Sequence, residues 1–394
     1  MKYWAGYVTA AILGAIAWAL GRLADRYSTL VDMIYPYVTR TVQDVLAQWS
    51  STVPFCLWQV AVMLLVIGAI AVLGLVIVLH WNPIRFFGWV LAAASFLYLG
   101  NTLVYGLNYY AGSIATDIRM QVYEYTVDEL TAAAKYYRDE ANALASQMNR
   151  DENGDLVYSD FETLTQQAGS GFETLVRGRS FSVMGGSNLP VKKLGWSGMY
   201  TAAGVTGVTV GLTGEAAVNP NIPVVSLPFT ICREMAHRKT IATEGDSNFA
   251  AFLACQANES LEFQYSAYYM AYRYCHLALT NADTNEAKVT AEILAQGEND
   301  YLRHDMGAYQ RFFKRSMDEN ASRLADTVND TYLKVNGVDS DNSVSDLLVS
   351  WHYQEVVLPT ITEEEVAFDP KDETQVDLTT TQVPPETEED TEGE

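Results

Sequence analysis

The chain has 394 residues and carries 25 Lys and Arg against 48 Asp and Glu, a formal net charge of −23. This balance excludes a nucleic-acid-binding protein that works through a basic surface, because the chain has no excess of cations to neutralise phosphates. Five His and four Cys are also too few for a His/Cys-rich metal array or a dense disulfide scaffold.

Three uncharged stretches near the N-terminus are long enough to cross a bilayer core about 30 Å thick. They cover about residues 3–21, 53–80 and 86–107, and the second contains the run VAVMLLVIGAIAVLGLVIVL. A signal peptide for the first stretch, or buried core helices for all three, is disfavoured by the length of the runs and the lack of a clear A-x-A site. We therefore expect residues 1–110 to form a membrane anchor of three transmembrane helices.

The segment 22–52 between the first two spans has apolar residues at helical spacing, which predicts an amphipathic helix. Pro36 is expected to break or kink that helix. Aromatic residues such as Tyr27 and Trp49 suit a helix in the membrane interface. A helix packed on the soluble domain fits the same pattern, so both interpretations stay open.

The loop charges orient the spans only weakly, since Lys and Arg are nearly balanced between the two sides. The tight WNPIR turn between the second and third spans suits a short cytoplasmic loop. This favours an N-terminus inside the cell, and three spans then place everything after residue 110 outside the cytoplasm.

Residues 111–360 are predicted to form one mostly helical α+β domain with a small sheet. The β-branched, Gly-punctuated segment 204–212 indicates a strand, and 222–231 with its two prolines indicates an edge strand or an extended connection. From Cys232 onward the pattern is helical. Residues 361–394 are strongly acidic and poor in apolar residues, so we expect a disordered tail.

The segment Arg233-Glu234-Met235-Ala236-His237 bears on the chemistry. In an HExxH helix, two His at i and i+4 share one face and bind zinc, while the Glu activates the metal-bound water. Here Arg233 stands at the position of the first His. Taken alone, RExxH is an ordinary pattern of a helix surface.

Several segments in this order resemble a family of bacterial membrane proteins, domain of unknown function 3810, which is considered zincin-like. They include YSTLVDMIYPYV, YGLNYY, KKLGWSGMYTAAGVTGVTVGLTGEAAVN, LPFTICREMAHRKTIATEGDSNFAAFLAC and NDTYLKVNG. Family members typically read LPFT-x-x-HE-x-AH-x-x-G…EAN at the core. The resemblance implies a protein of the bacterial cell membrane, with three spans followed by an extracytoplasmic, metallopeptidase-related domain.

The resemblance also implies roles for single residues. Glu234 matches the general base and His237 the second zinc ligand. Asp246 matches the Glu of the family's EAN segment, the expected third ligand. Glu215 matches an acidic position upstream, on the expected substrate-side strand.

The departures from the family pattern weaken the metal site. Arg233 has no lone pair to donate and stays protonated, so it cannot ligate zinc. The remaining His237 and Asp246 are fewer than the three protein ligands usual for catalytic zinc. We therefore hypothesise that Arg233 replaces the metal structurally, which leaves a cofactor-free pseudopeptidase that acts as a binding or regulatory module for a peptide or envelope protein.

Two other interpretations remain. In the first, the protein is an active zinc metallopeptidase that uses His237 with Asp246 and/or Glu259 as ligands and Glu234 as base. In the second, it is a structural membrane protein whose pocket is vestigial. Glu259, in Asn258-Glu259-Ser260, resembles the ligand Glu of thermolysin-like peptidases, but a solvated helix face is the more common interpretation of so short a motif.

The cysteines of the outer domain leave a further question open. Cys232, Cys255 and Cys275 are an odd number. A bridge between Cys232 and Cys255, a thiolate ligand from either one and free buried thiols are all compatible with the sequence.

Overall fold

The computed structural model describes residues 4–79, 82–335 and 343–360. The chain forms two units, Met1–Trp351 and His352–Glu394. In the second unit the described residues include the π-helical turn η4 (Tyr353–Val357). The predicted acidic tail, 361–394, lies outside the described residues.

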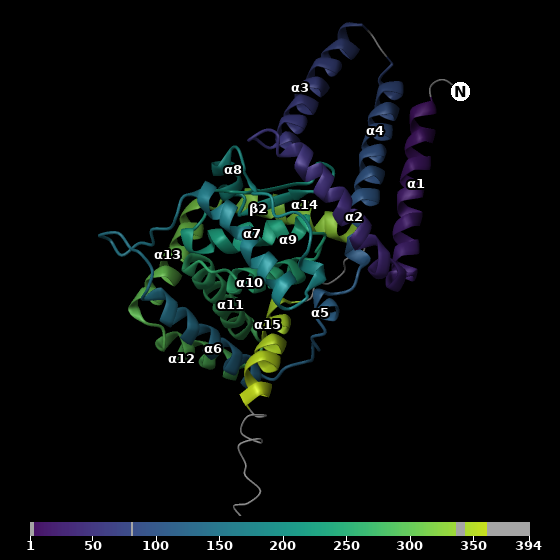
Figure 1. Ribbon diagram of the computed structural model, residues 1–394. Helices are drawn as coiled ribbons and strands as arrows, with labels where there is room; N and C mark the ends of the chain where they lie inside the picture. Colours follow the sequence, from purple (N-terminus) through teal and green to yellow (C-terminus); the bar gives the residue numbers. More distant parts are fainter. Residues whose placement is uncertain (1–3, 80–81, 336–342, 361–394) are drawn as a thin grey trace, which may run out of the picture. The chain divides into compact units, whose positions relative to one another are not determined.

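Three helices are long and apolar enough to cross a membrane, as predicted: α1 (Ala5–Arg26), α3 (Leu57–Val78) and α4 (Pro83–Val104). Helices α1 and α4 pack side by side (Figure 1). A Cβ atom added to Gly6 would lie 2.4 Å from the carbonyl carbon of Gly88, so the small residues allow the two backbones to approach closely.

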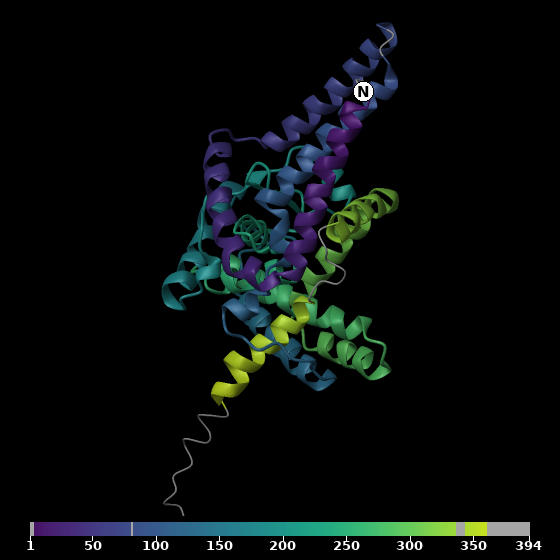
Figure 2. The same cartoon turned by 90° about the vertical axis from the view of Figure 1, so that its right-hand side faces the viewer.

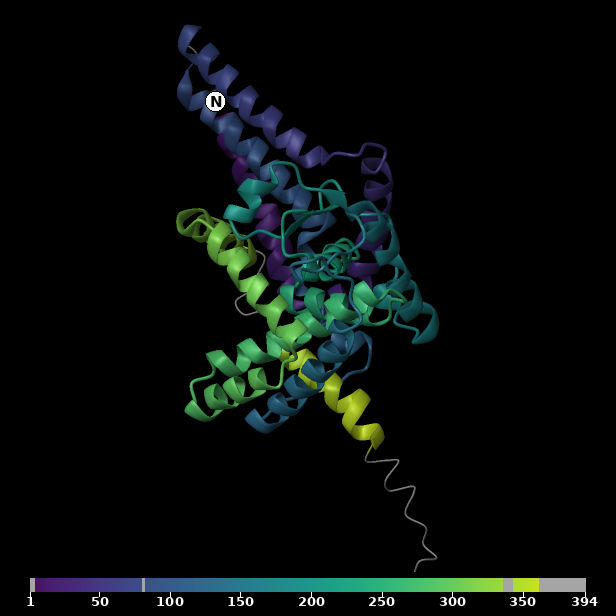
Figure 3. The same cartoon turned by 90° about the vertical axis from the view of Figure 1, so that its left-hand side faces the viewer.

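The segment between the first two spans is one helix, α2 (Ser28–Ser50), which runs from the end of α1 toward the start of α3 (Figures 2 and 3). Of the predicted break or kink at Pro36, the break is wrong, because the helix continues through this residue. Proline removes a single backbone donor, and contacts on both sides of it hold the helix. The Tyr35 hydroxyl donates to the Thr102 carbonyl of α4 at 2.8 Å, and the Arg40 Nε donates to the Lys239 carbonyl at 3.1 Å.

Helix α2 packs on the rest of its unit with its polar face. Thr39, Arg40 and Gln43 are buried, and Gln43 Nε2 donates to the carbonyls of Val104 and Gly211. The large apolar side chains of the opposite face are each more than half exposed: Leu30, Met33, Ile34, Tyr37, Val38, Val45 and Trp49. The polarity is therefore the reverse of that in an ordinary amphipathic helix on a water-soluble domain.

The domain that follows is built mainly from helices, and α11 crosses its core. The longer helices are α6 (Val127–Ala145), α7 (Phe161–Gly178), α9 (Leu227–Arg238), α10 (Glu244–Gln256), α11 (Leu261–Asn281), α12 (Asn285–Gln296), α13 (Asp300–Ser316) and α14 (Glu319–Val335). The shorter ones are η1 (Gly106–Tyr110), α5 (Ile114–Asp117), η2 (Ser182–Met184), α8 (Ser197–Ala202), η3 (Val224–Ser226) and α15 (Val344–His352). Helix α11 packs against α6, α9, α10 and α12, and its aromatic residues Phe263, Tyr265, Tyr269 and Tyr272 are fully buried. These aromatic residues therefore belong to the core.

Side-chain caps define where several of these helices begin. Thr126 and Glu129 form a reciprocal capping box at the start of α6, in which the Glu129 carboxylate accepts from the Thr126 amide at 2.7 Å. The Thr243 hydroxyl caps α10 by accepting from the amide of Asp246 at 3.3 Å. This second cap fixes the start of α10 close to the end of α9.

The small predicted sheet is present and has the strand order β1-β3-β2. Its strands are β1 (Lys192–Lys193), β2 (Gly207–Val210) and β3 (Glu215–Val218); β1 is parallel and β2 antiparallel to β3. The predicted strand at 204–212 contains β2, whereas the extended segment predicted at 222–231 is wrong. That segment forms η3 and the first turn of α9, where Pro228 fits because the first turn needs no donor from it.

Candidate functional site

The RExxH segment lies in α9, which packs against β2, β3 and α10. Every residue of α9 except Arg233 is buried, and the Arg233 side chain is 19% exposed. The helix is therefore an internal element, and Arg233 is its most exposed side chain.

The Arg233 guanidinium bridges two carboxylates from different helices. Its Nη2 donates to Glu234 Oε1 at 2.7 Å and to the Thr206 hydroxyl at 3.1 Å, while its Nη1 donates to Glu244 Oε2 at 3.3 Å. Burial lowers the pKa of Arg233, but Glu234 and Glu244 outweigh burial and raise it. The cation is therefore permanent.

Glu234 points from α9 toward strand β2. It is 1% exposed, and its Oε2 accepts a hydrogen bond from the Thr209 hydroxyl at 2.8 Å. A Cβ atom on Gly207 would lie 2.4 Å from Glu234 Oε1. Glycine at this position of β2 therefore makes room for the carboxylate.

Glu244, which the sequence analysis did not single out, stands in the first turn of α10 and faces both Arg233 and His237. Its Oε1 lies 3.6 Å from His237 Nε2, and its side chain is 42% exposed. Burial acts to raise the pKa of Glu244, but Arg233 and His237 prevail and lower it to about 2. The only sequence signal for Glu244 is an acid at the start of a helix, directly after a capping Thr.

His237 completes the group that we call the Arg233 cluster: Arg233, Glu234, His237 and Glu244. Its Nδ1 lies 3.0 Å from the Ile241 carbonyl. Burial lowers the pKa of His237, but the hydrogen bond and charge of Glu244 have the larger effect and raise it. The cluster thus places two carboxylates beside one guanidinium and one imidazole, so both negative charges have a cationic partner within the cluster.

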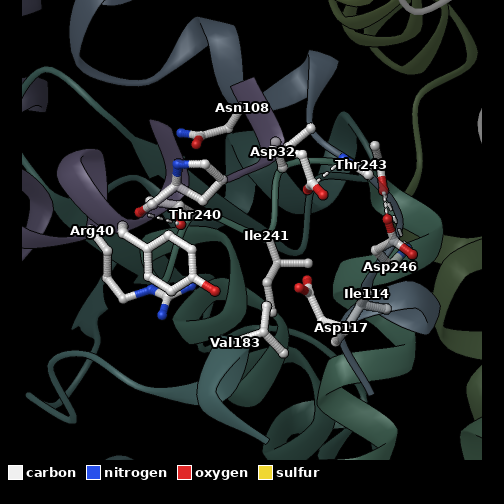
Figure 4. Close-up of a pocket in the computed structure, with 15 residues that line it drawn as sticks. Asp32, Arg40, Asn108, Ile114, Asp117, Val183, Thr240, Ile241, Thr243 and Asp246 are labelled. Carbon is white, nitrogen blue, oxygen red and sulfur yellow. Dashed lines mark hydrogen bonds between the residues drawn. The ribbon is translucent and has the colours of Figure 1, made fainter. Parts of the chain in front are cut away.

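Asp246, the expected third ligand, makes other contacts. Its Oδ1 accepts from the Ser113 hydroxyl at 2.6 Å and its Oδ2 from the Thr243 hydroxyl at 2.9 Å. It lines a recess of about 30 Å³ together with Asp32, Arg40 and other residues of α2 and α5 (Figure 4). That volume suits about one or two waters. Arg233, Glu234 and His237 do not line this recess.

Glu259 and Glu215 lie apart from the cluster. Glu259 is exposed and follows the C-terminal end of α10, which is about 20 Å long, whereas Glu244 stands at the N-terminal end.

Glu215 is buried at the start of α3, where its oxygens accept from the amides of Leu57 and Trp58 at 2.8 and 2.9 Å. Lys192 Nζ donates to the same carboxylate at 2.6 Å.

The residues at this centre do not fit a zinc ion. Arg233 at the first-ligand position offers no lone pair, and its guanidinium is bonded to the base-position Glu234. Within the part of the chain that the structure describes, no three His, Cys, Asp or Glu side chains come together as a metal site. The four described cysteines are all free and buried.

The fold defines a class of protein: three helices able to cross a membrane, joined to a mostly helical domain with a small mixed sheet. The chain belongs to the family described as protein of unknown function (DUF3810), whose model matches residues 31–349, more than half of the chain. No curated protein and no solved structure matches it. The predicted family is thereby confirmed, and its zincin-like character stays a prediction.

Proposed function

We propose that this protein is a membrane-anchored, zincin-like pseudopeptidase of the bacterial envelope, with its domain outside the cytoplasm. In this proposal Arg233 takes over the place of a catalytic metal, and the domain acts as a binding or regulatory module. The observation that carries the proposal is the guanidinium of Arg233, held between Glu234 and Glu244 at 2.7 and 3.3 Å.

The charge arrangement supports this replacement. Two carboxylates close to each other need a cation, or one of them takes up a proton. The guanidinium of Arg233 supplies that cation and adds directional hydrogen bonds. A metal-binding side chain at position 233 would not supply the positive charge by itself. The centre is then balanced without a metal, and it lacks a Lewis acid that could activate water.

A polypeptide in extended conformation is the partner class that the surroundings favour. Strand β2 is at one edge of the sheet, and its residues Gly207 and Thr209 border Glu234. An edge strand can accept a further strand through its backbone groups. We infer that a peptide segment of an envelope protein would bind along β2, beside the Arg233 cluster.

Zinc stoichiometry of the purified full-length protein in detergent tests the proposal. We expect no stoichiometric zinc in the unaltered protein. We expect about one equivalent in the Arg233→His variant, because His at 233 would join His237 and Glu244 as three ligands, the number typical of catalytic zinc. The matched control is the double variant Arg233→His/His237→Ala, which should lose the zinc again.

The alternative function makes the opposite prediction. One equivalent of zinc in the unaltered protein, lost in the His237→Ala variant, would overturn the proposal. It would indicate an active metallopeptidase with a variant ligand set and Glu234 as base. Peptide hydrolysis that is abolished by Glu234→Gln would then be the next measurement.

A further inference from the structure

Helix α2 carries an apolar stripe that nothing in the described chain covers. Seven large side chains on one face are each more than half exposed, and the stripe continues from Leu30 to Trp49. A contiguous apolar surface of this kind marks a contact with a partner or with lipid. The opposite face is occupied, because Arg40 and Gln43 bond to the domain.

The ends of α2 place it at the membrane. Only Tyr27 separates α2 from α1, and α3 begins at Leu57, a few residues after Ser50. The junction of α1 with α2 and the junction of α2 with α3 both contact the domain. Near the end of α1, Gly21 packs against η1, because an added Cβ atom there would lie 3.1 Å from the Tyr110 hydroxyl oxygen. At the start of α3, the amides of Leu57 and Trp58 donate to Glu215.

Because both ends of α2 adjoin segments that contact the domain, α2 does not cross the bilayer as a fourth span. The ends of α1 and α4 contact η1, and the start of α3 bonds to Glu215 of the domain, so these three helix ends lie on one side of the bilayer. A helix that joins two such ends returns to the side on which it started. It therefore lies along the membrane surface, with one long face toward lipid and the other toward the domain.

We propose that the exposed face of α2 is a lipid-contact surface that seats the domain on the bilayer. The stripe supplies the buried apolar area, and Tyr37 and Trp49 supply aromatic rings of the kind enriched at membrane interfaces. The turn after α9 rests on the polar face of α2, where the Thr240 hydroxyl donates to the Pro36 carbonyl and Arg40 bonds to Lys239. Lipid contact therefore holds the region next to the Arg233 cluster at the membrane surface. This inference rests on the spanning helices and not on the proposed function.

Spin-label accessibility in the full-length protein tests this surface. Nitroxide labels would be attached to Ile34→Cys and Val45→Cys in nanodiscs of phosphatidylcholine and phosphatidylglycerol. The native cysteines are at most 2% exposed, so labelling is directed to the new thiols. Ile67→Cys in α3 is the lipid-facing control, and Lys135→Cys on the domain is the aqueous control.

We expect the labels at positions 34 and 45 to have the same accessibility to oxygen and to a nickel complex as the label at position 67. Their collision rate with molecular oxygen, relative to that with a water-soluble nickel complex, should exceed the ratio at 135 several-fold. A ratio at either position equal to that at 135 would overturn the proposal. Dipolar broadening between labels, with protection from both reagents, would also overturn it, since it would assign the stripe to a second copy of the chain.

Discussion

Arg233 and Glu234 are neighbours in the chain and also partners in space. Adjacent residues of a helix usually point apart, but the long guanidinium side chain reaches back to its neighbour and onward to Glu244 on the next helix. This geometry uses the planar fork of arginine, which a lysine would not reproduce. The chemistry of the centre therefore depends on the residue type at position 233.

Removal of the cation should destabilise the protein. In Arg233→Met the buried Glu234 loses its charge partner, and we expect a loss of about 3 kcal/mol in unfolding free energy. The double variant Arg233→Met/Glu234→Gln should recover part of this loss, because the uncompensated buried charge is gone. Denaturant unfolding of the detergent-solubilised protein measures both.

A matched control is available on the surface. Arg177 pairs with Glu173 at 3.3 Å, but its side chain is 81% exposed, and Arg177→Met should cost at most about 0.5 kcal/mol. Equal losses for Arg177→Met and Arg233→Met would contradict the stabilising role of the cluster.

The pair His237 and Glu244 should make stability depend on pH in a defined window. The folded pKa of Glu244 is lowered to about 2, so its contribution is present above its unfolded pKa of about 4.3 and is lost as the pH falls toward 2. The folded pKa of His237 is raised, so its contribution is complete below its unfolded pKa of about 6.5 and is lost as the pH rises through the folded value.

The variant Glu244→Gln removes the pH-dependent contribution of the His237–Glu244 pair to stability. The difference in melting temperature between the unaltered protein and the variant should be largest between about pH 4.3 and 6.5. Above that window a smaller difference should persist, because the bond between Arg233 and Glu244 does not titrate there. A difference that stays constant from pH 5 to pH 9 would show that His237 does not contribute.

Among the elements, α3 is joined to the domain by Glu215 and by Gln59, whose side chain bonds to the backbone of Gly195. Glu215 ends the turn between β2 and β3 and accepts from the first two amides of α3. An acid at a helix N-terminus satisfies free amides and favours the helix dipole. Lys192, on the neighbouring β1, neutralises the carboxylate at 2.6 Å.

Glu215→Ala should loosen this joint. The variant leaves the Lys192 ammonium without its carboxylate, and we expect a loss of about 3 kcal/mol. Hydrogen exchange at the amides of Leu57 and Trp58 should also become faster. Glu259→Ala, which changes an exposed acid, is the control and should alter neither measurement. Unchanged exchange in Glu215→Ala would contradict the capping role.

At the level of the complete chain, the three apolar helices relate the side of the membrane on which the domain lies to the side of the N-terminus. An odd number of spans puts the N-terminus and the domain on opposite sides. The proposed extracytoplasmic domain therefore requires a cytoplasmic N-terminus. The loop charges contribute little to this choice, since basic residues are nearly balanced.

Reporter fusions test the orientation. Alkaline phosphatase, which folds only outside the cytoplasm, should be active when it is fused after Glu394. The same reporter fused after Asn82, between the second and third spans, should be inactive. The reverse pattern would place the domain in the cytoplasm and would contradict the envelope location.

Features that depend on local physical quantities can be predicted from the amino-acid sequence. The length and hydropathy of three uncharged runs predict three helices, and residue periodicity predicts a helical domain with a small sheet. Arg233 marks a departure from HExxH, and segments such as YGLNYY and NDTYLKVNG indicate the family. Each of these inferences needs only residues close together in the chain.

Which side chains meet depends on how the helices pack against one another. Glu244 faces Arg233 and His237, whereas Asp246, two residues later, points toward Ser113. Two positions along a helix turn a side chain by about 200°, so the choice depends on how α10 packs against α9. The two α3 amides that donate to Glu215 are more than 150 positions away in the chain. Such contacts follow from long-range packing, which no local pattern specifies.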